Sequence, residues 1–417
     1  MKSNAARFLI FLFCNMIGLA AIAQYQCISG GRYDTEIFSN VTITSDITYG
    51  SAKTVNNTTQ TLTLDIYQPT GDTASKRPMI IWGHGGSFIG GTKNDGDVTT
   101  LCTRFAKMGY ICVSYNYRLG MGFPINQTNA SRAVYRATQD AKAVIRFFRK
   151  DASTSNTYKV DPNYIYLGGS SAGAFIALHH AYLDDQAEVP SYIDTTGLGV
   201  IEGTSGNPGY PSEVKAIINL CGALGSASWM HSGDEALCSM HGTDDTVVPY
   251  ATDTIVVLTV PIMVVDGSHT IDSMATTLNL HHVFHTWNGA DHVPYASNAT
   301  YMDSTVTFVR DFLCTVITDT VTQFSNGVQN INSTSAGISL YPNPASDHIF
   351  ITAPSSSPSD AELRLYDLGG RCVLAGSLSQ TALGCGSLAP GFYVWRVSSS
   401  LDPPFMQSGK IILEERK

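Results

Sequence analysis

Charged residues are scarce in this chain. Asp, Glu, Lys and Arg together make up 14% of the 417 residues. Ser, Thr, Asn and Gly are used in their place, a surface composition typical of exported proteins. Positive charge is not in excess either, because the formal net charge is −9 at pH 7. The sequence therefore lacks the basic surface that nucleic-acid binding requires.

Cysteine is present, but not in the pattern of a metal or redox site. None of the nine cysteines has Cys-x-x-Cys spacing, which argues against zinc and thiol–disulfide chemistry. Eight cysteines remain once the N-terminal segment described below is removed, an even number that can form disulfides in an oxidising compartment. Two pairings are compatible with position, Cys372 with Cys385 and Cys221 with Cys238. Buried free thiols are the alternative.

The apolar run at the N-terminus is short for a membrane span. It covers Phe8–Ala23, whereas a bilayer needs about 20 apolar residues. Lys2 and Arg7 stand before or at its start, and Ala21-Ile22-Ala23 fits the small-x-small rule for signal-peptide cleavage. We interpret residues 1–23 as a secretory signal peptide, with a membrane anchor as the alternative.

Hydrophobic patterning further along the chain alternates between strands and helices. Continuous apolar runs such as Pro78–Trp82 are typical of strands buried on both faces. The expected strands lie in Thr42–Pro69 and at Pro78–Trp82, Tyr110–Tyr115, Tyr164–Leu167, Ala216–Leu220, Ala236–Met240 and His282–Trp287. The expected helices end near Met108 or cover about 130–150, 172–182 and 301–316. This alternation predicts an α/β fold with a mostly parallel, mixed sheet covered by helices.

Two later stretches break that pattern. Residues from about Asp185 to Pro211 are rich in Gly, Pro and Thr, and we expect them to form an insertion over the C-terminal edge of the sheet. Residues 319–337 form a polar, Asn- and Ser-rich linker. Short alternating strands separated by turn residues follow in 338–417 and predict a small all-β sandwich.

Gly169-Ser170-Ser171-Ala172-Gly173 is the only G-x-S-x-G in the sequence. It follows a predicted strand and opens a predicted helix, which is the context that a nucleophile elbow requires. A sharp strand-to-helix turn needs neighbours without bulk, and it lifts the Ser171 hydroxyl clear of the sheet. The helix N-terminus also favours negative charge that develops nearby. We therefore predict that Ser171 is a nucleophile.

Three further motifs accompany it. His84-Gly85-Gly86-Ser87 ends an upstream strand, His241-Gly242-Thr243-Asp244-Asp245 precedes a Val-Pro pair, and Asn288-Gly289-Ala290-Asp291-His292 follows the last predicted strand. In this order the four motifs resemble those of α/β-hydrolases of the esterase/lipase group with an HGG oxyanion loop, over residues from about 42 to 318. That group includes carboxylesterases and acetyl- or feruloyl-esterase-like enzymes.

The resemblance implies a role for each of these residues. It makes His292 the general base and Asp245 the acid that orients it, in the family order serine, acid, histidine. The oxyanion hole would be formed by backbone amides, with a supporting role for the start of the HGG loop and no metal or other cofactor. The implied set is Ser171, Asp245 and His292 for catalysis, Gly86, Ser87 and Ala172 for the oxyanion hole, and His84 and Gly85 for loop support.

A dense group of histidines offers a competing site. His281, His282 and His285 lie on one predicted strand. Side chains alternate along a strand, so His282 is expected on the opposite face from the other two. No carboxylate nearby in the sequence completes a likely metal site, so we expect no metal to bind there.

The C-terminal segment carries a resemblance of its own. Leu340-Tyr341-Pro342-Asn343-Pro344, Gly391-Phe392-Tyr393-Val394 and Gly409-Lys410-Ile411-Ile412 are similar to motifs of the type IX secretion sorting domain of gram-negative bacteria. This implies export through the periplasm to the medium or cell surface, by means of the type IX machinery. A carbohydrate-binding β-sandwich is the alternative.

Together these observations predict a secreted serine ester hydrolase. The expected organisation is a signal peptide (1–23), an α/β-hydrolase domain (24–318), a linker (319–337) and a sorting sandwich (338–417). The substrate would be an ester, such as an acylated polysaccharide or another extracellular ester. An amidase or peptidase with the same triad is the main alternative. A non-catalytic adhesion protein fits less well, because such proteins typically lose a triad residue.

Overall fold

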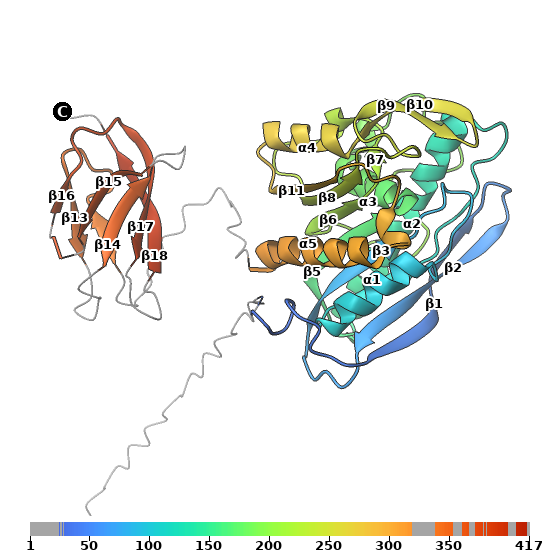
Figure 1. Ribbon diagram of the computed structural model, residues 1–417, viewed down its shortest axis with the longest axis horizontal. Helices are drawn as coiled ribbons and strands as arrows, with labels where there is room; N and C mark the ends of the chain where they lie inside the picture. Colours follow the sequence, from blue (N-terminus) through green and yellow to red (C-terminus); the bar gives the residue numbers. More distant parts are fainter. Residues whose placement is uncertain are drawn as a thin grey trace, which may run out of the picture. The chain divides into compact units, whose positions relative to one another are not determined.

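The computed structural model describes residues 25, 27, 29–318, 338–352, 361–366, 372–377, 379–380, 382–398 and 406–414. The chain divides into two compact units, Met1–Thr322 and Gln323–Lys417 (Figure 1). The predicted signal peptide and linker lie outside the described residues. No helix in the described part of the chain has both the length and the apolar character that a membrane span needs.

An eight-stranded sheet runs through the first unit in the order β1-β2-β4-β3-β5-β6-β8-β11. Neighbouring strands from β4 to β11 are parallel, while β2 pairs antiparallel with both β1 and β4. The mostly parallel, mixed sheet is therefore confirmed. Its strands are β1 (Val41–Lys53), β2 (Thr59–Pro69), β3 (Arg77–Gly83), β4 (Ile111–Tyr115), β5 (Val160–Ser170), β6 (Ala216–Leu220), β8 (Ala236–Gly242) and β11 (His282–Trp287).

Helices cover both faces of this sheet. Successive residues of a strand point to opposite faces, so each strand contributes side chains to two cores. Ile80 and Trp82 of β3 belong to the core under α1 and α5, whereas Met79 and Ile81 belong to the core under α2, α3 and α4. The helices are α1 (Gly96–Lys107), α2 (Gln127–Ser153), α3 (Ala172–Tyr182), α4 (Ser268–Thr277) and α5 (Ala299–Thr318).

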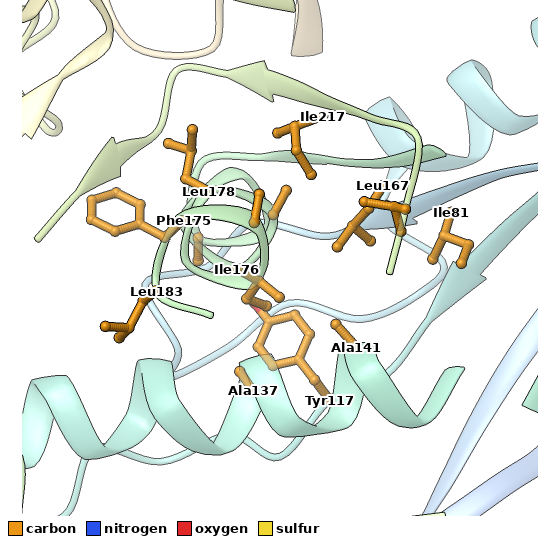
Figure 2. Packing of buried hydrophobic residues seen from close by; sticks show 14 of the residues in the cluster. Ile81, Tyr117, Ala137, Ala141, Leu167, Phe175, Ile176, Leu178, Leu183 and Ile217 are labelled. Atoms are coloured by element: carbon orange, nitrogen blue, oxygen red, sulfur yellow. The ribbon is translucent and has the colours of Figure 1, made fainter. Parts of the chain in front are cut away.

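The packing of α2 against α3 explains the small residues on one side of α2. Ala137 and Ala141 are fully buried and lie on the side of α2 that faces α3 (Figure 2). Short side chains there let the two helices approach closely. Helix α3, which follows Ser171, is thereby held between the sheet and α2.

Several elements were not predicted from the sequence. A second sheet has the order β7-β10-β9, with β9 and β10 forming an antiparallel hairpin. Leu258 and Thr259 form its turn, and both have positive φ. Gly and Asn are the usual residues at such positions, so the turn carried no sequence signal. These elements are β7 (Ala223–Leu224), β9 (Thr252–Val257), β10 (Val260–Gly267), α4, and the short 3-10 helices η1 (Gln186–Glu188), η2 (Ala227–Trp229) and η3 (Pro294–Ala296).

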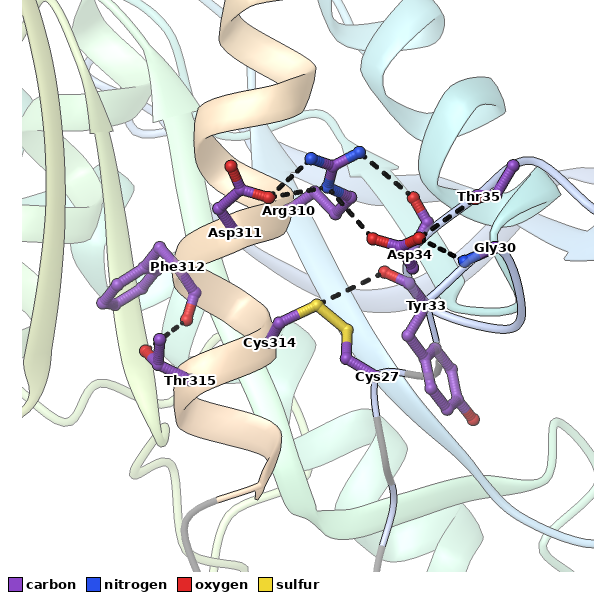
Figure 3. The surroundings of a disulfide bond; sticks show 10 residues. All are labelled: Cys27, Gly30, Tyr33, Asp34, Thr35, Arg310, Asp311, Phe312, Cys314 and Thr315. Atoms are coloured by element: carbon purple, nitrogen blue, oxygen red, sulfur yellow. Dashed lines mark hydrogen bonds and ion pairs between the residues drawn. A yellow bond between two sulfur atoms is a disulfide. The ribbon is translucent and has the colours of Figure 1, made fainter. Parts of the chain in front are cut away.

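The disulfide differs from both expected pairings. Cys27 is bonded to Cys314 of α5, 287 positions away (Figure 3). Beside it, Arg310 of α5 forms ion pairs with Asp34 and Asp311. The expected partners are not bonded, since Cys221 and Cys238 are buried free thiols and Cys372 is an exposed one. The position of two cysteines on neighbouring strands or in the same module therefore did not predict which cysteines form the disulfide.

The second unit contains two sheets. One has the order β12-β13-β16 and the other β15-β14-β17-β18. Ile349 of the first sheet and Leu363 and Trp395 of the second belong to one buried cluster, as the predicted sandwich requires. The strands are β12 (Ser339–Tyr341), β13 (His348–Thr352), β14 (Glu362–Tyr366), β15 (Cys372–Ser377), β16 (Ala382–Gly384), β17 (Gly391–Ser398) and β18 (Met406–Leu413).

Candidate active site

Ser171 occupies a sharp turn between β5 and α3. Its backbone has φ +53° and ψ −115°, a conformation that costs about 1–3 kcal/mol for a residue with a side chain. The Ser171 amide donates to the Leu220 carbonyl at 2.9 Å, which holds the turn against β6. A Cβ on Gly169 would collide with the backbone of Gly173, and one on Gly173 would collide with Gly83. The two glycines of the motif are thus required by close backbone contacts.

The structure brings Ser171, His292 and Asp245 together. The Ser171 Oγ lies 2.8 Å from His292 Nε2, and His292 Nδ1 lies 2.6 Å from Asp245 Oδ2. The three residues follow β5, β11 and β8, which are parallel strands whose carboxyl ends meet at one edge of the sheet. A hydroxyl, an imidazole and a carboxylate therefore form one continuous hydrogen-bonded chain.

The carboxylate of Asp245 is fully enclosed by hydrogen-bond donors. Its Oδ1 accepts the amides of Val247 at 2.9 Å and Val248 at 2.8 Å. Its Oδ2 contacts His292 and, at 3.1 Å, His241 Nε2. Burial alone would raise the pKa of Asp245, but the hydrogen bonds from His241 and His292 outweigh it and hold that pKa well below its usual range. The group is thus a stable anion beside the imidazole.

The two neighbouring aspartates have other partners. The Asp244 carboxylate accepts the Thr243 hydroxyl at 2.9 Å. Asp291 Oδ1 accepts the Thr246 amide at 2.9 Å and the His292 amide at 2.7 Å, so it ties the acid loop to the histidine loop. Among the hydrogen bonds of the described residues, neither carboxylate reaches the His292 ring.

The HGG loop lies beside the nucleophile. Gly86 and Ser87 have φ values of +104° and +52°. A Cβ on Gly85 would lie 3.4 Å from the Ser171 Cβ, so the loop backbone runs directly past that side chain. Within the described residues, no hydrogen bond uses the amides of Gly86, Ser87 or Ala172. These N–H groups are therefore available to a substrate oxygen.

His84 supports the backbone of this loop. It is buried, and its ring stacks on the Tyr117 ring with 4.2 Å between centroids. Its Nδ1 lies 2.7 Å from the Gly85 carbonyl, and Tyr117 donates to the His84 carbonyl at 3.0 Å. Burial lowers the pKa of His84, which favours a neutral ring. His84 therefore contacts the backbone of this loop both directly and through Tyr117.

A polar network behind the acid escaped sequence reasoning. His241 Nδ1 lies 2.7 Å from the Ser268 hydroxyl, and the Asn219 amide donates to the same hydroxyl at 2.9 Å. The Tyr295 hydroxyl lies 2.8 Å from the Ser170 hydroxyl, directly behind the nucleophile. His241 opened the acid motif, but no spacing rule connects it with Ser268 or Asn219.

Among the described residues, one group of ionisable side chains has the spacing of metal ligands. Ligand atoms of Cys221, Asp245 and His292 lie within 4.8 Å of one another. Burial raises the pKa of Cys221, which favours the protonated thiol over the thiolate that binds metals. Asp245 and His292 already bond to each other. The geometry therefore matches a hydrogen-bonded triad better than a cation site.

The three clustered histidines have separate surroundings. His282 Nε2 lies 3.3 Å from the carboxylate of Asp272. The expectation that no carboxylate lies near these histidines is therefore wrong. His281 Nε2 lies 3.1 Å from Thr315, and His285 packs against the ring of Phe308. The cluster does not converge on one point in the described structure.

A pocket that is partly open to solvent leads away from Ser171. Its walls come from the HGG loop, one side of α2, one side of α3, the insertion and the β9–β10 hairpin. The insertion was expected here and contributes Tyr192, Ile193 and Ile201. The hairpin was not expected, although its apolar runs indicate strands in retrospect.

Comparisons with known families agree with this architecture. Residues 64–233, which include Ser171 and the HGG loop, match the model of the BD-FAE family, an esterase-like α/β-hydrolase family. The first unit has the α/β-hydrolase fold. Residues 339–414 match the secretion system C-terminal sorting domain, so this α/β-hydrolase carries a sorting domain.

Individual relatives match shorter segments. The hydrolase is 33% identical to carboxylesterase 3B of Mus musculus over 116 residues, which are 28% of this chain and 19% of that protein. It is 31% identical to the quorum-quenching protein AidA of Acinetobacter baumannii over 121 residues, 29% of this chain and 36% of that protein. The chain thus spans only a small part of the mouse relative.

Solved structures cover more of the chain at lower identity. The propionate-bound esterase of Thermogutta terrifontis is 20% identical and covers 68% of this chain and 97% of its own, with a TM-score of 0.48. A truncated carbohydrate esterase from gut microbiota is 20% identical, covers 67% of this chain and 98% of its own, and has a TM-score of 0.46.

Proposed function

We propose that this α/β-hydrolase is a secreted serine carboxylic-ester hydrolase. The Ser171 Oγ attacks the acyl carbon of the ester while His292 Nε2 accepts its proton. The negative charge that forms on the carbonyl oxygen is stabilised by the amides of Gly86, Ser87 and Ala172. His292 then donates the proton to the departing alcohol, which leaves an acyl group on Ser171.

Water completes the cycle. His292 removes a proton from a water molecule as the water oxygen attacks the acyl carbon, and it then returns that proton to Ser171 Oγ as the bond between Oγ and the acyl carbon breaks and the acid is released. Throughout, Asp245 fixes the orientation of the imidazole and stabilises its positive charge. The chain's own residues supply every group in this sequence, so the proposal invokes no cofactor.

One observation carries this proposal. The hydrogen-bonded chain from Ser171 Oγ through His292 to Asp245, with distances of 2.8 and 2.6 Å, opens beside unpaired backbone amides and an apolar pocket. The completeness of the triad disfavours a purely adhesive role. Residues 1–23 and the sorting domain support a further proposal, passage through the periplasm to the medium or cell surface by the type IX machinery.

The direct test compares wild type with Ser171→Ala. Purified mature protein is assayed on p-nitrophenyl butanoate and on the matched butanoyl anilide, and folding of both proteins is checked by circular dichroism. We expect ester hydrolysis by wild type and a loss of several orders of magnitude in the variant. Substantial ester turnover by folded Ser171→Ala would refute the assignment, and faster turnover of the anilide would favour an amidase.

A further inference from the structure

One side of α3 forms a continuous wall of the pocket. Ser171, Phe175, His179 and Leu183 are spaced four residues apart and all line it. Figure 2 shows Phe175 and Leu183 on one side of the helix. A rise of 1.5 Å per residue places Leu183 about 18 Å from Ser171 along the axis. The pocket is therefore much longer than an acetyl group.

The opposite walls are also apolar. Helix α2 contributes Ala130 and Val134, and the β9–β10 hairpin contributes Ile255, Val257 and Met263. No Asp, Glu, Lys or Arg occurs among the described residues that line the pocket. A charged acyl group would therefore find no side chain of opposite charge among these residues.

The polar atoms in these walls are largely engaged by the protein. His179 Nδ1 lies 2.8 Å from the Phe175 carbonyl, and His179 Nε2 accepts the Gly225 amide at 3.3 Å. Burial lowers the pKa of His179 to about 4, so the ring is neutral at pH 7. Thr138 donates to the Val134 carbonyl at 3.0 Å. A polar acyl group beside His179 and Thr138 would lose its water contacts without gaining partners from these two side chains, at about 1–3 kcal/mol for each unpaired group.

We propose that this pocket binds the acyl chain of an ester of a straight-chain aliphatic acid of medium to long length, and that the β9–β10 hairpin limits the accepted length. This inference rests on the proposed function, because it places the ester carbonyl at Ser171. A short acyl group would leave most of the pocket unfilled. A phenolic or sugar acid would bury hydroxyl groups against walls formed mostly by apolar side chains, aliphatic and aromatic.

The hairpin offers a matched pair of positions for the test. Met263 lines the pocket, and its Sδ lies 3.7 Å from the Ser131 hydroxyl on α2. Val264 is the next residue on the same strand and is 56% exposed. Strand alternation directs the two side chains to opposite faces. A bulky residue at 263 should shorten the pocket, whereas the same residue at 264 should leave it unchanged.

The first experiment measures binding without turnover. Full-length mature Ser171→Ala is titrated calorimetrically with the methyl esters of butanoic, octanoic and dodecanoic acid, and with methyl cinnamate. We expect affinity to rise roughly threefold to fourfold per added methylene, as about 0.8 kcal/mol per buried CH2 implies. Equal affinities across the aliphatic series, or tightest binding of the cinnamate, would overturn the inference.

The second experiment measures kcat/KM on the corresponding p-nitrophenyl esters. We expect Met263→Trp to lower the value for the dodecanoate roughly tenfold or more while sparing the butanoate. Val264→Trp should match wild type on both esters. If the tryptophan variant does not fold, Met263→Ala and Val264→Ala are compared instead, and only Met263→Ala should change the ratio of kcat/KM for the dodecanoate to that for the butanoate. An equal effect at both positions would overturn the role of the hairpin.

The two levels of the proposal fail separately. If wild type hydrolyses no ester but Ser171→Ala binds longer chains more tightly, the proposed reaction is wrong and the ligand class is supported. If wild type hydrolyses esters without regard to chain length, the reaction is supported and the ligand class is overturned.

Discussion

Asp245 accepts hydrogen bonds from two imidazole rings and two backbone amides. Such a set leaves the carboxylate little freedom to rotate, so the orientation of His292 is fixed by the fold. The adjacent Asp244 instead accepts a hydrogen bond from a neighbouring threonine. Two chemically identical neighbours therefore differ completely in what they can do for the proposed reaction.

This difference is testable by three single substitutions. We expect Asp245→Asn to lower kcat by roughly four orders of magnitude, because an amide cannot hold the imidazole in the required tautomer. Asp244→Asn and Asp291→Asn should stay within roughly tenfold of wild type. Steady-state kinetics on one p-nitrophenyl ester measure all three. An inactive Asp244→Asn with an active Asp245→Asn would mean that the acid had been misassigned by one residue.

His179, a residue of the pocket wall, makes the stability of the protein depend on pH. Burial lowers its pKa from 6.5 to about 4, so the folded protein keeps the ring neutral at a pH where the unfolded chain binds a proton. Its contribution to stability is therefore complete above about pH 6.5 and is lost as the pH falls towards 4.

We therefore expect the stability difference between wild type and His179→Gln to shrink on acidification. The free energies of unfolding, measured by urea denaturation, should approach each other by about 3 kcal/mol between pH 7 and pH 4. Comparing the two proteins cancels the titration of other groups, including the buried His180. A difference that is constant with pH would contradict the effect of burial on His179.

At the residue scale, the sequence predicted which side chains lie together where the residues directly follow strands. The motifs around Ser171, Asp245 and His292 directly follow predicted parallel strands, whose ends must meet, and the structure brings the three side chains together. The contacts of His241 with Ser268, and of Ser268 with Asn219, join side chains 27 and 49 positions apart. They depend on how α4 packs on the sheet, and α4 itself was not predicted.

Three elements were predicted to the residue. The helix Ala172–Tyr182 and the strands Ala216–Leu220 and His282–Trp287 have the predicted bounds. The hairpin β9–β10 is apolar on both faces, since Val256 and Val264 are exposed while Val257 and Val265 are buried. It therefore lacks the alternation that identifies a strand on a protein surface.

The insertion is more firmly attached than its composition indicated. Arg146 of α2 is buried and is paired with the carboxylate of Glu202. Ser212 donates to the same carboxylate at 2.8 Å. Replacing the whole segment from Asp185 to Pro211 would thus remove a partner that a buried guanidinium needs, in addition to changing the pocket.

We expect Glu202→Ala to lower the free energy of unfolding by roughly 1–3 kcal/mol, a moderate value because Glu202 is half exposed. Asp194→Ala, which removes a surface ion pair with Arg132, should change stability by less than about 0.5 kcal/mol. Chemical denaturation measures both variants. Equal effects would show that the insertion is not anchored through Arg146.

At the scale of the whole molecule, the two units have separate cores. The buried clusters of the first unit contain residues up to Ile317, and that of the second contains residues from Ile338 to Leu413. Within the described residues, neither core includes a residue of the other unit. Each unit therefore has the buried apolar surface that independent folding requires.

A chain ending after residue 321 should consequently fold and keep the ester hydrolase activity of the full protein. We expect thermal denaturation and kcat/KM to match those of the first unit in the intact chain. In the native host, the truncated protein should accumulate in the periplasm, because it lacks the sorting domain. Normal appearance outside the cell would contradict the proposed role of that domain.

The bond between Cys27 and Cys314 joins the segment before β1 to the last helix of the hydrolase unit. The chain between them is therefore a covalent ring. A protease that cuts one exposed loop of this ring opens it but releases no fragment, and both new ends remain attached to the same folded core. Outside the cell, where proteases are common and reducing agents scarce, a single nick would thus leave the hydrolase in one piece.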